Sequence, residues 1–169
     1  MRRREFITLL GGAAAWPLAA RAQQRERMRR IGALMNLTAG DQEGQSRIAG
    51  FLQGLQERGW AVGGNVRIDY RWGGNDAALY RRGAEELIAL APDVVLASGT
   101  AALGAMHSLT RTVPIVFVNV VDPVGGGFVA SLAQPGGTST GFTVFEYSIA
   151  GKWLELLKQI APNTSLGNH

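Results

Sequence analysis

The sequence contains no cysteine, and its only histidines are His107 and His169. Without cysteine the chain can form no disulfide bond and can carry no lipid-modified cysteine, so its fold must rely on a hydrophobic core. The common zinc sites are built from sets of cysteine and histidine that two histidines cannot supply. We therefore expect no metal site.

Motifs of cofactor-dependent and hydrolytic enzymes are also missing. The glycines at residues 125–127 lack the preceding strand and the spacing of a dinucleotide-binding loop. The glycines between residues 136 and 141 are not followed by the Lys-Ser or Lys-Thr pair of a phosphate-binding loop. There is no Gly-x-Ser-x-Gly nucleophile elbow, and no nucleophile paired with a base is evident. We expect no cofactor, no catalytic residue and no enzymatic activity.

Long apolar runs are absent, and the apolar stretch at residues 7–15 is well below the roughly 20 residues of a membrane-spanning helix. This stretch follows Arg2-Arg3-Arg4 and precedes Ala20-Arg21-Ala22, which is an A-x-A cleavage signature. The pattern predicts a secretory signal peptide at residues 1–22, cleaved after Ala22. The paired arginines favour the twin-arginine (Tat) route, with the general secretory route as the alternative. We expect a periplasmic protein without a supply of ATP or NADH.

The positive charge of the chain belongs mostly to this leader. The whole sequence has a net charge of +4, of which the leader holds +3, so the mature chain has +1. A nucleic-acid-binding domain needs a basic face of its own. The remaining basic arm at residues 23–29 is interpreted as a solvated linker, and we expect no nucleic-acid partner.

Short apolar runs alternate with longer patterns of helical period after the linker. Strands are predicted at residues 31–35, 66–72, 94–97, 115–118 and 140–144. Helices are predicted at residues 42–58, 76–91, 100–109, 123–132 and 148–160. This alternation predicts an α/β fold, an open, doubly wound parallel sheet of about five strands with flanking helices. One lobe at residues 30–162 and a tail at 163–169 are expected.

Open parallel sheets bind ligands at the carboxyl ends of their strands. The residues predicted to bind a ligand there are Asn36, Thr38, Ser98, Gly99, Thr100, Asn119, Asp122 and Thr143. Thr100 can cap the helix at 100–109, whose free N–H groups favour an anion such as a carboxylate, and the two roles can coexist. Asp122 before Pro123 is either a helix cap or a carboxylate that holds a substrate amine.

Several segments together resemble one family. They read RRREFIT at residues 2–8, GFLQGL at 50–55, NVRIDYRW at 65–72, PDVV at 92–95, PIVFV at 114–118, DPVG at 122–125 and GFT at 141–143. The chain resembles, as far as about residue 162, the ABC-transporter substrate-binding proteins of the periplasmic-binding-protein type I fold, in the tryptophan/tyrosine-type branch. The resemblance implies a two-lobed receptor that closes on a small solute, an amino acid or a small carboxylate, and delivers it to an ABC permease in the inner membrane.

The resemblance also implies a second lobe that is not found here, because residues 163–169 show no strand. We expect a chain truncated to the N-terminal lobe that binds its solute weakly or not at all, because one lobe supplies only part of the contacts. The cleft face that lacks its partner can drive self-association. An exported periplasmic α/β enzyme remains the alternative from the sequence alone.

Overall fold

The fold is taken from a computed structural model that describes residues 28–145 and 147–161. The predicted leader, residues 23–27 of the predicted linker and the predicted tail lie outside the described residues. The strands are β1 (Arg29–Met35), β2 (Val66–Trp72), β3 (Val94–Ser98), β4 (Ile115–Val121) and β5 (Ser139–Phe145). The helices are α2 (Gln42–Glu57), α3 (Ala77–Ala89), α4 (Thr100–Leu109) and α5 (Tyr147–Ile160).

The strands form one five-stranded sheet in the order β2-β1-β3-β4-β5, and every neighbouring pair is parallel. The predicted fold class is confirmed. β2 lies at an edge, which agrees with its alternation of apolar and polar residues. The chain leaves β1 for β2 on one side and later returns to β3 on the other side of β1. The carboxyl ends of β1 and β3 therefore flank a topological switch point.

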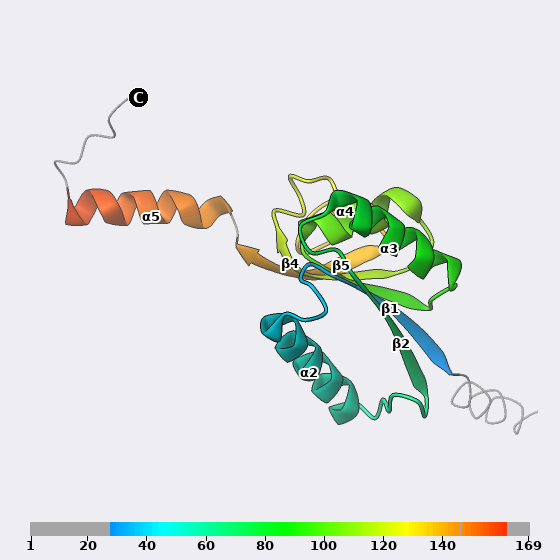
Figure 1. The fold of residues 1–169 in the computed structure, drawn as a ribbon. Coiled ribbons are helices and arrows are strands. Elements are labelled where there is room, and N and C mark those ends of the chain that lie inside the picture. Colours follow the sequence, from blue (N-terminus) through cyan, green and yellow to red (C-terminus); the bar gives the residue numbers. More distant parts are fainter. Residues whose placement is uncertain (1–27, 146, 162–169) are drawn as a thin grey trace, which may run out of the picture.

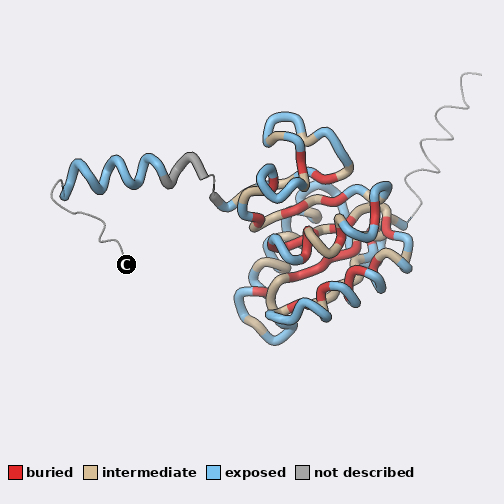
Figure 2. The backbone as a smooth tube through the Cα atoms, turned by 90° about the horizontal axis from the view of Figure 1, so that it is seen from above, coloured by how far each residue is buried: buried red, intermediate tan, exposed pale blue. Residues whose placement is uncertain are grey.

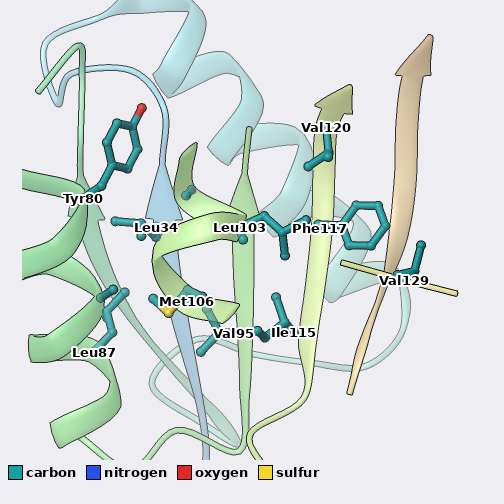
Figure 3. Close-up of a cluster of buried hydrophobic side chains, with 13 residues drawn as sticks. Leu34, Tyr80, Leu87, Val95, Leu103, Met106, Ile115, Phe117, Val120 and Val129 are labelled. Atoms are coloured by element: carbon teal, nitrogen blue, oxygen red, sulfur yellow. The ribbon is translucent and has the colours of Figure 1, made fainter. Parts of the chain in front are cut away.

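The main core fills the space between the sheet and the helices α3 and α4 (Figure 1). Figure 3 shows side chains from the strands facing side chains from these two helices. The largest fully buried apolar side chains among the described residues are Leu34, Leu87, Leu103, Met106, Ile115, Val66, Val95 and Val120. Burial of such side chains is the main force that holds the lobe together in the absence of disulfides.

A hydrogen bond and an ion pair, both to Asp93, hold the start of β1 in place. Asp93, just before β3, accepts a hydrogen bond from the Arg30 backbone N–H at 2.8 Å and pairs with the Arg29 guanidinium at 3.0 Å. Arg29 is thus the first residue of the sheet, which corrects its predicted place in the linker. The alternation of charged residues before β1 gave no sign of this contact, because it joins residues far apart in the sequence.

The segment between β4 and β5 corrects a second prediction. The helix expected at residues 123–132 does not form, and the chain makes consecutive turns there instead. Three successive glycines disfavour a helix, and Asp122 Oδ1 accepts the Gly125 N–H at 2.8 Å to close a turn. Phe128 and Val129 still pack on the core, whereas Leu132 is exposed.

The opposite face of the sheet is less completely covered. α2 lies on this side of the sheet, across from α3 and α4 (Figure 1). Asp41 caps the start of α2 by accepting the Glu43 and Gly44 N–H groups. The predicted apolar stripe of α2 is only half-buried, and Gly44 is its one buried residue.

α5 extends away from the rest of the lobe, with exposed backbone along the part that Figure 2 colours. The helix forms where the sequence predicts it, but its apolar side chains Trp153, Leu156, Leu157 and Ile160 are exposed. None of the helices in the described part of the chain is long and apolar enough to cross a membrane.

Candidate functional site

The switch point brings two predicted site residues into direct contact. The Ser98 hydroxyl, at the end of β3, donates a hydrogen bond to Asn36 Oδ1 at 3.0 Å, and Asn36 directly follows β1. Ser98 is fully buried, so its hydroxyl needs a partner inside the protein. The two loops that the sequence placed at one rim of the sheet are thus joined by a side-chain contact.

Gly99 makes this close approach possible. Its backbone has φ +90°, a conformation that residues with a side chain rarely adopt, and a Cβ added there would lie 3.0 Å from Asn36 Cβ. The Gly99 N–H donates to the Val118 carbonyl at 2.9 Å, which ties the loop to β4. The glycine therefore fixes the distance between the ends of β1, β3 and β4.

Thr100 does not cap α4, which corrects one of its two predicted roles. Gly99 occupies the N-cap position, and no side chain caps the helix. The Thr100 hydroxyl instead accepts the Val121 N–H at 3.3 Å and connects the start of α4 to the end of β4. The first N–H groups of α4 therefore have no side-chain cap among the described residues, which leaves the predicted anion-binding role of this helix end as a proposal.

Asn119 lies inside β4 rather than after it, because the strand continues to Val121. Its φ is +56°, and the pairing of β4 with β5 shifts register between Phe117 and Val120. A left-handed residue in a strand produces such a bulge and redirects the side chains around it. Asn tolerates this conformation better than most residues, which gives a structural reason for its presence.

The other predicted residues lie around the same edge with fewer contacts. Asp122 follows β4 with φ +46° and holds the turn at Gly125. Thr143 lies within β5 and pairs with Val120. Thr38 is exposed in the loop after β1, where its carbonyl accepts the Asp41 N–H at 3.1 Å. Within the part of the chain that the structure describes, no hydrogen bond joins Thr38 or Thr143 to the Asn36–Ser98 pair.

A cavity of about 320 Å³ lies between α2 and the sheet beside these residues. Two predicted residues, Ser98 and Asn119, line it. The sequence reasoning missed two further polar lining residues, Arg47 of α2 and Tyr70 of β2. The sequence pattern did indicate the position of Tyr70, because Tyr70 shares one side of β2 with Val66 and Ile68. No pattern in the sequence around Arg47 indicated that it faces the same cavity.

The electrostatics of the cavity come from Arg47. Its Nε donates to Glu43 Oε1 at 2.9 Å, and its Nη1 lies 3.4 Å from Asn36 Oδ1. Burial raises the pKa of the Tyr70 phenol above its ordinary value of 10.0, so this hydroxyl stays protonated. The described residues contain no cluster of histidine, aspartate and glutamate that could hold a metal ion.

Comparison with known families gives one match over most of the chain. Residues 40–166 match the model of a family described as ABC transporter substrate binding protein. A curated relative, the tyrosine-binding protein of Clostridioides difficile (strain R20291), is 33% identical over 113 residues. This alignment covers 67% of the chain and 32% of that relative.

Solved structures of similar fold agree with this family match. A conserved domain protein from Vibrio cholerae superposes with a TM-score of 0.69 at 30% identity. This alignment covers 81% of this chain and 45% of the Vibrio chain. An ABC domain from Streptococcus pneumonia in complex with L-Trp has a TM-score of 0.67 at 27% identity, with 80% and 44% covered. The ligand-free, open form of a Clostridium difficile substrate-binding protein with adhesive properties also has 0.67, at 29% identity, with 80% and 45% covered. The chain spans about a third of the length of the curated relative and less than half of each structure.

Proposed function

Because the chain belongs to the family of ABC transporter substrate-binding proteins, we propose that it is a solute receptor that binds an amino acid or a small carboxylate at the carboxyl ends of its parallel strands. The observation that carries this proposal is the convergence of Asn36, Ser98 and Asn119 at the switch point of the sheet. Two similar proteins support a solute of this class, because one is a tyrosine-binding protein and the other is in complex with L-Trp.

The receptor would deliver its solute to an ABC permease in the inner membrane and would reach the periplasm by means of the leader at residues 1–22. A reporter fused behind residue 22 tests this export. We expect its export to stop when Arg3 and Arg4 are both replaced by lysine. Export that is unchanged by the double substitution would assign the leader to the general secretory route.

We propose that the 169-residue chain binds its solute weakly on its own. The described strands form one sheet with one rim, whereas the affinity of a closing receptor comes from burying most of the ligand surface between two lobes. The membership of the family also supports a binding protein over the exported enzyme that the sequence left as an alternative.

A thermal-shift screen of amino acids and small carboxylates, followed by calorimetry of each hit, tests the proposal. We expect stabilisation without turnover and a Kd weaker than micromolar. The Ser98→Ala variant should lose the stabilisation, and Ser108→Ala, an exposed serine of α4, should keep it. Turnover of a hit, or stabilisation that Ser98→Ala leaves unchanged, would contradict the proposed site.

A further inference from the structure

The cavity lies between α2 and the sheet, and the first turn of α2 approaches the sheet closely. A Cβ added to Gly44, in the first turn of α2, would lie 3.0 Å from the Trp72 ring. Ile48 and Phe51, further along the helix, line the cavity and are therefore only half-buried. α2 lies along the face of the sheet opposite α3 and α4 (Figure 1). The space of about 320 Å³ is of a size that proteins use for small ligands.

The walls of the cavity are mostly apolar and carry one positive charge. The apolar lining residues are Met35, Ile48, Phe51, Leu96 and Val118. The polar ones are Arg47, Tyr70, Ser98 and Asn119, so the lining holds a guanidinium and no carboxylate. A charged ligand would therefore be an acid, and an ammonium group would find no counter-charge on these walls.

Tyr70 gives a second indication that the cavity binds a ligand. Its hydroxyl oxygen is buried, yet it has no hydrogen-bond partner within the described residues. Buried hydroxyl groups are nearly always hydrogen-bonded, and an unpaired one lowers stability. The raised pKa of the phenol keeps it a donor. An acceptor atom on a bound molecule would give the Tyr70 hydroxyl its hydrogen-bond partner.

Arg47 is available to such a ligand. Its ion-pair partner Glu43 has a side chain that is 63% exposed, so water weakens the pair. Its contact to Asn36 is long, at 3.4 Å, and its Nη2 makes no hydrogen bond within the described part of the chain. The Nη2 group is therefore a charged donor that a carboxylate oxygen can accept, and the weak Asn36 contact at Nη1 can give way to the second oxygen.

A second cavity, of about 410 Å³ at the other end of α2, shows the contrast. It is also apolar and also has an arginine, Arg29, in its lining. There the arginine is paired with Asp93 at 3.0 Å, and Asp93 itself lines the cavity. The charge is neutralised within the protein, so this second cavity offers no attraction to an anion.

We propose that the cavity lined by Arg47 and Tyr70 takes an apolar monocarboxylic acid without an amino group, with its carboxylate on Arg47 and a hydrogen-bond acceptor on Tyr70. The acid fills the space between Phe51, Leu96 and Val118 with its apolar body. The inference rests on the proposed function, because Ser98 and Asn119 belong both to this cavity and to the rim of the sheet. It narrows the solute class from amino acids and carboxylates to acids that lack the ammonium group.

The probes are 3-phenylpropionate, its neutral amide and L-phenylalanine, each titrated by NMR into the ¹⁵N-labelled 169-residue chain. We expect 3-phenylpropionate to bind with a Kd of about 1 mM, a range open to a ligand of its size. The amide and L-phenylalanine should each bind about 10-fold more weakly, because one lacks the negative charge and the other adds an unpaired positive charge. The shifted backbone amides should include those of Arg47, Tyr70 and Val118.

Three variants place the probe in the cavity. Arg47→Met should weaken 3-phenylpropionate about 10-fold, whereas Arg58→Met, an exposed arginine just after α2, should leave its Kd within about 2-fold. Val118→Phe should fill the cavity and abolish binding while the circular dichroism spectrum is kept. Tyr70→Phe should weaken benzoylformate, whose keto oxygen is an acceptor, more than it weakens 3-phenylpropionate.

Tyr70→Phe also separates binding from structure. Because the hydroxyl is unpaired, its removal should leave the Tm of the free chain unchanged or higher. A fall in Tm would mean that the hydroxyl is already satisfied, which contradicts the inference.

The failure of this inference and the failure of the proposed function give different results. If Arg47→Met and Val118→Phe leave binding intact while Ser98→Ala removes it, the rim is the site and the cavity assignment is wrong. If no 3-phenylpropionate binds at about 10 mM while an amino acid does, the ligand class is wrong and the receptor function stands. If neither acids nor amino acids bind, both proposals are overturned for this chain.

Discussion

The Ser98 hydroxyl donates a 3.0 Å hydrogen bond to Asn36 Oδ1 across the switch point of the sheet. This contact joins β1 to β3 at the edge where ligands bind in open parallel sheets. Asn36 Oδ1 also lies 3.4 Å from Arg47 Nη1, so one side chain connects two strands with the helix α2. A small polar network therefore joins the elements at this edge in addition to the apolar core below it.

Replacing Ser98 with alanine should lower the free energy of unfolding by about 1 kcal/mol, because the hydrogen bond from the buried Ser98 hydroxyl to Asn36 is lost. Urea denaturation measures the change. Ser108→Ala is the matched control on the exposed face of α4, where the hydroxyl only donates to the Ala105 carbonyl of its own helix. Equal effects of the two substitutions would mean that the Ser98 bond adds no stability.

Replacing Gly99 with alanine should destabilise the lobe by roughly 2–3 kcal/mol, through backbone strain at φ +90° and the 3.0 Å approach to Asn36. Gly50→Ala provides the opposite case, since Gly50 is exposed within α2 and a Cβ there would meet nothing within 4 Å. It should stabilise by about 0.5–1 kcal/mol, as glycine is disfavoured inside helices. A Gly99→Ala variant as stable as the parent would show that this loop relaxes freely.

Asn119 separates strain from binding. Its φ of +56° should make Asn119→Gly neutral or slightly stabilising by roughly 0.5 kcal/mol, while the loss of the amide weakens solute binding. Ala91→Gly is the control, because Ala91 has φ +49° and is exposed after α3, away from the cavity. It should stabilise the chain without changing affinity. Loss of affinity in both variants would point to a general change in the lobe.

Most of the fold could be predicted from the sequence because its signals are local. The β-branched run at residues 115–118 and the apolar spacing of the helices each indicate one element, and alternation of the two fixes a parallel sheet. The contact of Asn36 with Ser98 follows from the same rule, since both residues end strands. The prediction was wrong at residues 123–132, where the turn at Asp122 and the glycines prevail over an apolar pattern of helical period.

The missed features depend on contacts between distant segments. The continuation of β4 through Asn119 requires a left-handed residue, which no local pattern indicates. The place of Arg47 in the cavity follows from how α2 packs on the sheet, where Gly44 lies close to Trp72, and these residues are far apart in the sequence. The apolar stripe of α5 predicted a helix correctly, but the period of a stripe says nothing about what covers it.

His107 predicts a pH dependence of stability. Its ring lies edge-on to Phe128 at 5.5 Å and faces the Arg111 guanidinium. Burial and then the charge of Arg111 lower the pKa of His107 below its ordinary value of 6.5. The unfolded chain therefore binds a proton at His107 more readily than the folded chain does. The stability that neutral His107 contributes is complete above pH 6.5, and it is lost as the pH falls through 6.5 towards the lower pKa of the folded chain.

We expect His107→Gln to reduce the loss of Tm between about pH 7.5 and pH 5.5 compared with the parent chain. The effect should be small, because the histidine is only partly buried. Comparing the two Tm curves cancels the titration of all other groups. Parallel curves would show that His107 contributes nothing to the pH dependence.

The exposed apolar side chains of α5 predict self-association. Leu157 is 60% and Ile160 79% exposed, and Phe142 on β5 is 74% exposed. Exposed apolar side chains that gather on one element, as they do on α5, tend to be covered by another protein surface. Sedimentation velocity should show a dimer or larger species that dissociates on dilution. The double variant Leu157→Glu/Ile160→Glu should shift the chain to a monomer, because burying either carboxylate in an apolar interface is unfavourable.

A matched charge variant tests whether the added negative charge, rather than the loss of apolar surface, causes the double variant to dissociate. Lys152→Glu changes the net charge by the same amount as the double variant, but replaces a residue of α5 that is already charged. It should leave the concentration-dependent species in place, since the apolar stripe is intact. A parent chain that stays monomeric at every concentration would contradict the prediction of self-association. A Lys152→Glu variant that dissociates like the double variant would rule out the α5 stripe as the contact and leave the sheet face around Phe142 as the surface to test next.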